Sequence, residues 1–197
     1  MTVPVFEFDG CDTAKMMNRV FAENVVDLLN KFEKGSPEFD RGFVHTSVIP
    51  HEGTCYHDYA WTRDAGRGIM EAARMGSTEK ARDAIRFFMK NKNAGSHWRR
   101  LAAQRKSMQQ DVAGNSCEFE TDGDALVLLA FYNTWKYSGR DRALAEEILE
   151  SAESVISWMQ AQMAQCPVGR LVPSISELSG NPTFNARKVY AIYPNFH

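Results

Sequence analysis

The sequence YAWTRDAGRGIMEAARMGSTEKARDAIRFFMKN, residues 59–91, decides the fold class because it contains two helical segments separated by a short turn. The first segment, residues 64–75, ends at Gly76, and a glycine just past the last helical position is a common stop signal. The second segment, residues 78–91, carries apolar side chains at helical spacing: Ala81, Ile85, Phe88 and Met89. We therefore predict two antiparallel helices that form a hairpin.

The same arrangement recurs along the rest of the chain. Residues 121–138 are predicted to form a helix that is apolar nearly all round over residues 125–135, so it should be covered on both sides. Gly139 separates it from a long partner helix over residues 141–163.

Shorter or weaker patterns complete the prediction. Residues 12–33 and 183–197 read as helices and residues 43–49 as a short extended piece. Residues 97–108 are weakly patterned and could form either a basic helix or a loop. Repeated helical hairpins within 197 residues predict one all-α domain, residues 1–197, of the α/α-toroid type.

Composition excludes several classes of protein. The chain has 25 acidic and 23 basic residues, which argues against nucleic-acid binding by bulk positive charge. No apolar run approaches the roughly 20 residues that span a bilayer, and the start, MTVPVFEFDG, lacks the features of a signal peptide. The four cysteines lie far apart: Cys11, Cys55, Cys117 and Cys166. Such spacing favours free thiols in a reducing compartment, and we predict a cytoplasmic protein.

The densest group of polar and aromatic residues is HDYAWTRD, residues 57–64. If this stretch is extended, Tyr59, Trp61 and Arg63 point to one side, whereas Asp64 points to the other. Sugars are recognised by such a mixture, because aromatic rings cover their C–H faces and charged groups bind their hydroxyls. The alternative interpretation is structural: the two aromatic residues belong to the core, and Arg63 and Asp64 form a surface or capping pair.

Several stretches resemble conserved regions of the glucoamylase family. YAWTRDAGRGIMEAARMG, residues 59–76, resembles that family's first region, in which an aromatic residue, Trp and Arg-Asp lead into a helix. TDGDALVLLAFYNTWKYSGRD, residues 121–141, is similar to the next region, in which an Asp-Gly stretch opens an inner barrel helix. ESVISWM, residues 153–159, and GRLVPSISELSG, residues 169–180, fit the same order.

The resemblance implies an (α/α)6 barrel of which residues 1–197 form the N-terminal part, and a glycosidase that releases terminal glucose from short α-linked gluco-oligosaccharides with inversion. It implies that Arg63 and Asp64 bind hydroxyls of the terminal glucose, that Tyr59 and Trp61 line its pocket, and that Glu177 is the general acid. The general base would lie on a later hairpin, outside residues 1–197. The expected partner is an oligosaccharide, without cofactor or metal.

Other interpretations remain open at this stage. A module built from the same hairpins could bind carbohydrate, or interact with other molecules, without catalysis. His51, Cys55 and His57, with His45, could bind zinc, although their spacing fits no structural zinc pattern. Of the alternating acids Glu118, Glu120, Asp122 and Asp124, we interpret Asp122 as a helix cap and the others as solvated. A chain of this length alone is expected to self-associate through apolar faces of residues 125–135 and 183–197.

Overall fold

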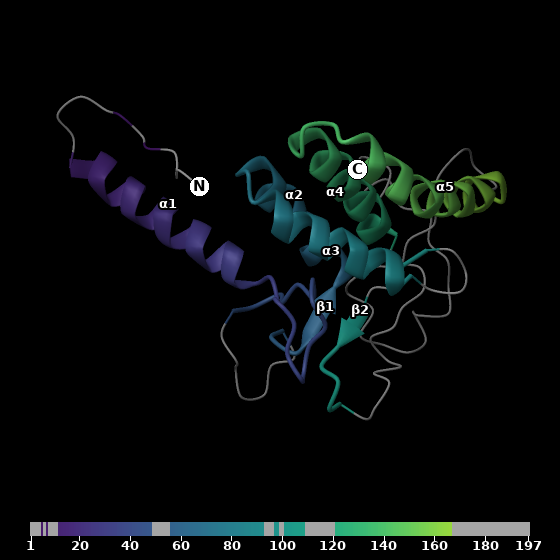
Figure 1. The fold of residues 1–197 in the computed structure, drawn as a ribbon, viewed down its shortest axis with the longest axis horizontal. Helices are drawn as coiled ribbons and strands as arrows, with labels where there is room; N and C mark the ends of the chain where they lie inside the picture. Colours follow the sequence, from purple (N-terminus) through teal and green to yellow (C-terminus); the bar gives the residue numbers. More distant parts are fainter. Residues whose placement is uncertain are drawn as a thin grey trace.

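The computed structural model of the 197-residue chain describes residues 5, 7, 12–48, 56–92, 97–98, 101–108 and 121–166. Helices make up most of these residues, as the sequence predicts. They are α1 (Asp12–Asn30), α2 (Thr62–Arg74), α3 (Thr78–Lys90), α4 (Asp122–Tyr137) and α5 (Arg142–Ala164). Two short strands, β1 (Tyr59–Trp61) and β2 (Leu101–Gln104), lie below the helices in Figure 1.

Two predicted hairpins are confirmed, and glycine makes both turns. Gly76 lies between α2 and α3 with φ of 81°, and Gly139 lies between α4 and α5 with φ of 79°. A side chain at either position would meet no atom within 4 Å, so the backbone conformation rather than the available space calls for glycine. The Asp141 carboxylate then caps α5, accepting hydrogen bonds from the N–H groups of Ala143 at 2.9 Å and Leu144 at 3.4 Å.

The closest helix pair is α2 with α4, which are not neighbours in the chain. A Cβ added at Gly66 of α2 would lie 2.9 Å from the backbone carbon of Leu126 in α4. One added at Gly123 of α4 would lie 2.9 Å from a methyl carbon of Thr62 in α2. These contacts place the N-terminal turns of the two helices together and show that the helices run parallel.

Helix α4 lies within the core, as its nearly uniform apolar character predicts. Phe131 and Val127 of α4 join a core cluster that also includes Ile69 of α2 and Ile85 of α3. Along residues 125–135, the exposed large apolar side chains are Leu129 and Tyr132.

The small sheet differs from the prediction for residues 97–108, which expected a helix or a loop. Residues 101–104 instead form β2, which pairs antiparallel with β1, with Ala60 opposite Ala103. Pairing with a distant strand outweighs the weak helical pattern of this segment. In the stretch predicted as an extended piece, Val44 makes a single bridge with Phe32, and residue 49 lies outside the described part of the chain.

Helix α1 projects from the helical body in Figure 1. Its exposed side chains include Met16, Val20 and Val26, whereas Val25 is buried.

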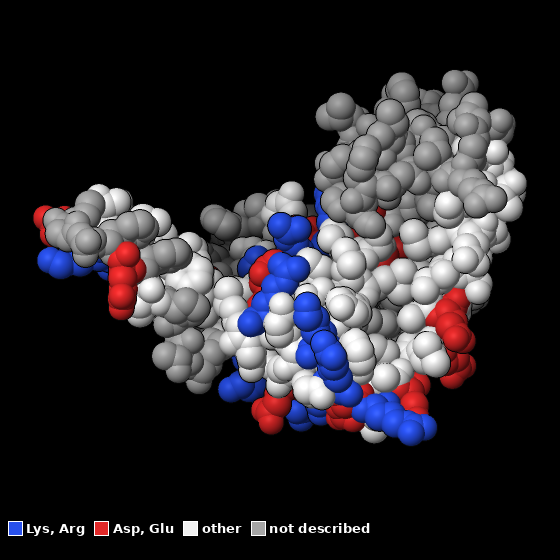
Figure 2. Space-filling view, turned by 90° about the horizontal axis from the view of Figure 1, so that it is seen from above, with Lys and Arg blue, Asp and Glu red and all other residues white. Residues whose placement is uncertain are grey.

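Seen from above in Figure 2, basic side chains gather over the middle of the molecule and acidic side chains flank them. Within the described ranges, no helix combines the length and the apolar character needed to cross a bilayer.

Candidate functional site

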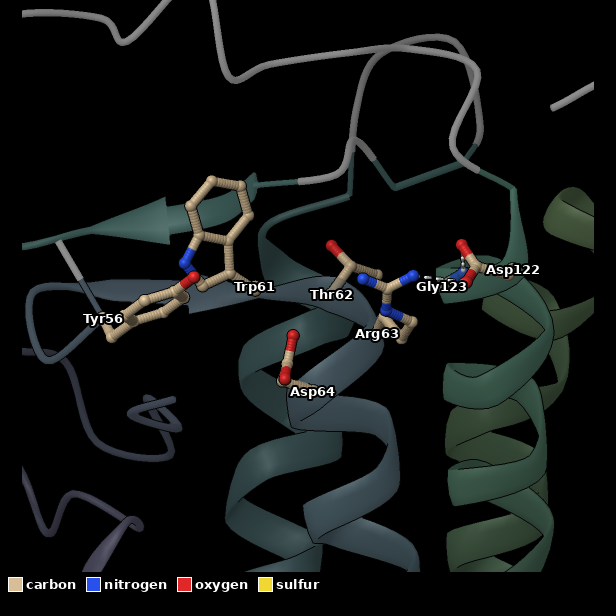
Figure 3. Close-up of a pocket in the computed structure, with 7 residues that line it drawn as sticks. All are labelled: Tyr56, Trp61, Thr62, Arg63, Asp64, Asp122 and Gly123. Carbon is tan, nitrogen blue, oxygen red and sulfur yellow. Dashed lines mark hydrogen bonds and ion pairs between the residues drawn. The ribbon is translucent and has the colours of Figure 1, made fainter. Parts of the chain in front are cut away.

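A pocket of about 160 Å³ opens where α2 and α4 begin (Figure 3). Its lining combines aromatic rings, a hydroxyl group, a guanidinium and carboxylates: Tyr56, Trp61, Thr62, Arg63, Asp64, Asp122 and Gly123. Sites for drug-sized ligands have volumes of roughly 300–1,000 Å³, so this pocket suits one small ring rather than a long chain.

Strand β1 positions the two aromatic residues that were singled out from the sequence. Both are buried, Tyr59 with 5% and Trp61 with 8% of its surface exposed. Their rings meet edge to face, with centroids 5.9 Å apart. Trp61 lines the pocket, whereas Tyr59, which was also expected to line it, is not among the lining residues and contacts the Trp61 ring.

The expected alternation along residues 58–64 ends at Trp61 because α2 begins at Thr62. Arg63 and Asp64 therefore lie in the first turn of a helix, where side chains fan out around the axis instead of alternating. In Figure 3 the Asp64 carboxylate is drawn below Trp61, Thr62 and Arg63, and all four residues line the same pocket.

Arg63 is held by a residue 59 positions further along the chain. Its Nη1 lies 3.1 Å from Oδ2 of Asp122, the first residue of α4, and Asp122 is 3% exposed. The second carboxylate oxygen of Asp122 accepts a hydrogen bond of 3.0 Å from the N–H of Gly123. A buried carboxylate fixed in this way sets the position of the guanidinium in the pocket.

Asp64 is exposed, unlike the buried Asp122. Within the described residues its carboxylate makes no hydrogen bond or ion pair. It lies in the first turn of α2, where the partial positive charge of the helix N-terminus favours a carboxylate. Its acceptor oxygens are therefore available to the hydroxyl groups of a ligand.

Sequence reasoning did not assign Tyr56, Thr62, Asp122 or Gly123 to the site. Tyr56 is 53% exposed at the pocket, and Asp122 had been interpreted as a helix cap. The cap position is occupied by Thr121, and Asp122 is the first residue inside the helix. The sequence signal that could have assigned Asp122 and Gly123 to the site is the Asp-Gly pair in residues 121–141, the second stretch that resembles the glucoamylase family. Glu177, the candidate general acid, lies outside the described residues.

Asp124 was predicted to be solvated, but it is fully buried. Its Oδ1 accepts a 2.9 Å hydrogen bond from the N–H of Trp98, and its Oδ2 lies 3.4 Å from Nδ1 of His97. The His97 ring stacks on Trp158 of α5, with centroids 3.8 Å apart. Burial raises the pKa of Asp124, although its contacts with His97 and Trp98 act in the opposite direction. This carboxylate fastens residues 97–98 to the first turn of α4.

The structure argues against His45 as a zinc ligand. Both ring nitrogens of His45 already face acceptors, with Nδ1 2.6 Å from the carbonyl oxygen of His57 and Nε2 3.0 Å from Oε1 of Glu33. Among the described residues no three histidine, cysteine or acidic side chains are placed to hold a metal ion. His51 and Cys55 lie outside these residues.

Comparison of the chain with protein-family models, with curated proteins and with solved structures finds no match in any of the three.

Proposed function

We propose that the pocket at the start of α2 and α4 binds the terminal glucose of a short α-linked gluco-oligosaccharide. The observation that carries this proposal is the exposed Asp64 carboxylate, which has no partner among the described residues and lies beside Trp61 and Arg63. A pyranose presents an apolar face to an aromatic ring and hydroxyl groups to charged acceptors and donors. The lining of the pocket includes each of these groups.

Two further features support binding of one sugar ring. The pocket volume of about 160 Å³ limits the ligand to a small group. Its groups are also held in place before a ligand arrives, since Asp122 fixes Arg63 and the close approach of Gly123 to Thr62 fixes the two helices. Preorganised groups lose less conformational freedom on binding.

For the chemistry, we propose the glucoamylase-like reaction that the sequence resemblance implies. In an inverting glycosidase one carboxylic acid protonates the leaving oxygen, and a second carboxylate, roughly 6.5–9.5 Å away, activates water. Glu177 is the proposed acid. The base would come from a helix outside residues 1–197. The parallel packing of α2 with α4, each followed by a reversed helix, supports the proposed toroid, in which successive hairpins repeat this arrangement.

Calorimetric titration with maltose tests the binding proposal. Asp64→Asn keeps the shape of the side chain but removes its charge, and a hydrogen bond to a charged group is worth about 1.5–3 kcal/mol. We expect roughly a 10- to 100-fold loss of maltose affinity in this variant.

Asp12→Asn is the matched control, because Asp12 is also an acid in the first turn of a helix and is exposed away from the pocket. Both variants lose a helix-dipole interaction, but only Asp64→Asn should lose affinity. Equal affinities in the two variants, or no saturable binding to the unaltered chain, would contradict the proposal.

The alternative function, a carbohydrate-binding module without catalysis, is favoured if maltose binds and a chain that also carries the proposed base-bearing hairpin releases no sugar. Release of β-glucose from maltotriose, followed by NMR, would support the inverting enzyme. Glu177→Gln should then abolish release while maltose binding is retained.

A further inference from the structure

A second pocket, of about 280 Å³, lies where the segment after α1 meets the first turns of α3. It shares no lining residue with the pocket at the start of α2 and α4. Phe32, which is 5% exposed, supplies its apolar wall. Three cationic side chains line it, together with three carboxylates: Lys34, Arg41 and Lys80 with Glu33, Glu79 and Asp83.

The walls of this pocket are fixed by the backbone. Residues 32–44 form a hairpin in which Glu33 N–H donates to the Phe43 carbonyl at 2.9 Å and Gly42 N–H donates to the Glu33 carbonyl at 3.0 Å. Gly42 has φ of 84°, and a Cβ there would overlap the carbonyl oxygen of Asp83 in α3. The hairpin therefore lies directly against α3 and holds the cationic side chains near that helix.

Two of the carboxylates at this pocket already have a polar partner. Arg41 donates from Nε to Oδ2 of Asp83 at 2.8 Å. Glu33 lies 3.0 Å from Nε2 of His45. The Arg41–Asp83 bond orients the guanidinium, and its terminal N–H groups have no acceptor among the described residues. Glu79 is the one lining carboxylate for which no partner within these residues is found.

The two lysines make no ion pair within the described residues. Lys80 donates to the carbonyl oxygen of Leu29 at 3.0 Å, and its ammonium lies 6.0 Å from the centre of the Phe32 ring. Burial lowers the pKa of Lys80 and the charge of Lys34 lowers it further, whereas the charges of Asp83 and Glu33 raise it. Lys34 is exposed and makes no hydrogen bond or ion pair within the described ranges. Like charges brought together in this way repel each other unless an anion lies between them.

We propose that this second pocket binds a phosphate group, held by the ammonium groups of Lys34 and Lys80 and by the terminal N–H groups of Arg41. A phosphate monoester carries about −1.5 to −2 charges at neutral pH and has several strong acceptor oxygens, which suits cationic donors from three residues that line one pocket. The neighbouring Phe32 wall would contact the carbon skeleton of a phosphorylated small molecule. The proposal is independent of sugar binding at the pocket between α2 and α4.

Titration with inorganic phosphate at constant ionic strength tests the proposal, because screening is then the same at every point. Binding is followed by NMR through the Gly42 amide, which lies in the hairpin beside the pocket. We expect saturable binding to the unaltered chain and at least about a tenfold loss of affinity in Lys34→Gln.

Lys15→Gln is the matched control, since it removes the same charge from an exposed position on α1. Its phosphate affinity should stay within about twofold of the unaltered chain. Acetate, titrated in the same way, should bind at least about tenfold more weakly than phosphate, which carries more charge. Equal losses in the two variants, acetate binding as tight as phosphate binding, or no saturation with phosphate would overturn the proposal.

Discussion

The replacement of Gly66 by alanine tests the packing that creates the candidate sugar pocket. In the interior of a helix, alanine is normally more favourable than glycine by about 0.8–1.0 kcal/mol. At Gly66, however, the new Cβ would lie 2.9 Å from the backbone carbon of Leu126 and 3.0 Å from the backbone nitrogen of Val127. Backbone atoms cannot rotate away as a side chain can, so α2 and α4 must separate.

The expected magnitude follows from these two opposing effects. Overpacking a well-packed interface costs about 1–3 kcal/mol, and a contact with backbone belongs at or above the upper end of that range. After subtraction of the gain in helix propensity, Gly66→Ala should lower the free energy of unfolding by about 2 kcal/mol. For a chain of this size that corresponds to a fall in Tm of about 4–8 °C.

Gly68 provides a control within the same helix. A Cβ at Gly68 would lie 3.8 Å from a methyl carbon of Leu28 and 3.9 Å from one of Val44, which are ordinary contacts. Gly68→Ala should therefore raise the free energy of unfolding by up to about 1 kcal/mol. Urea unfolding followed by far-UV circular dichroism measures both variants. If Gly66→Ala is as stable as Gly68→Ala, the close approach of α2 to α4 is wrong.

Two further predictions concern carboxylates. Asp141→Ala removes the cap of α5 and should cost about 1 kcal/mol in urea unfolding, whereas a change below about 0.3 kcal/mol would show that the cap is not needed. For Asp124, burial raises the pKa in the folded chain above its unfolded value of about 3.9, so the folded chain binds more protons than the unfolded chain. The stability of the folded chain should therefore fall as the pH rises from about 4 through the folded pKa. Asp124→Asn keeps an acceptor for the Trp98 N–H, and the free energy of unfolding measured between about pH 4 and 7 should lose this slope. An unchanged slope would contradict the assignment.

The helices could be predicted because their signals are local. Apolar spacing and the turns at Gly76 and Gly139 predicted α2 to α5 to within a few residues. Strand β2 could not be predicted, because its partner β1 lies about 40 residues away and the pattern of residues 97–108 is weak. The burial of Asp124 was missed for a related reason: alternating acids resemble a solvated surface, and the groups that contact Asp124 are distant in the sequence.

The sequence by itself determined that the chain is mostly helical, where its hairpins turn, and that Trp61, Arg63 and Asp64 are candidates for one site. Only the tertiary structure decided that α2 lies beside α4 and that Arg63 pairs with Asp122, 59 residues further on. Periodicity states which face of a helix is apolar, but not which partner covers it. That choice depends on how closely two backbones can approach, and here Gly66 and Gly123 allow the approach because neither has a side chain.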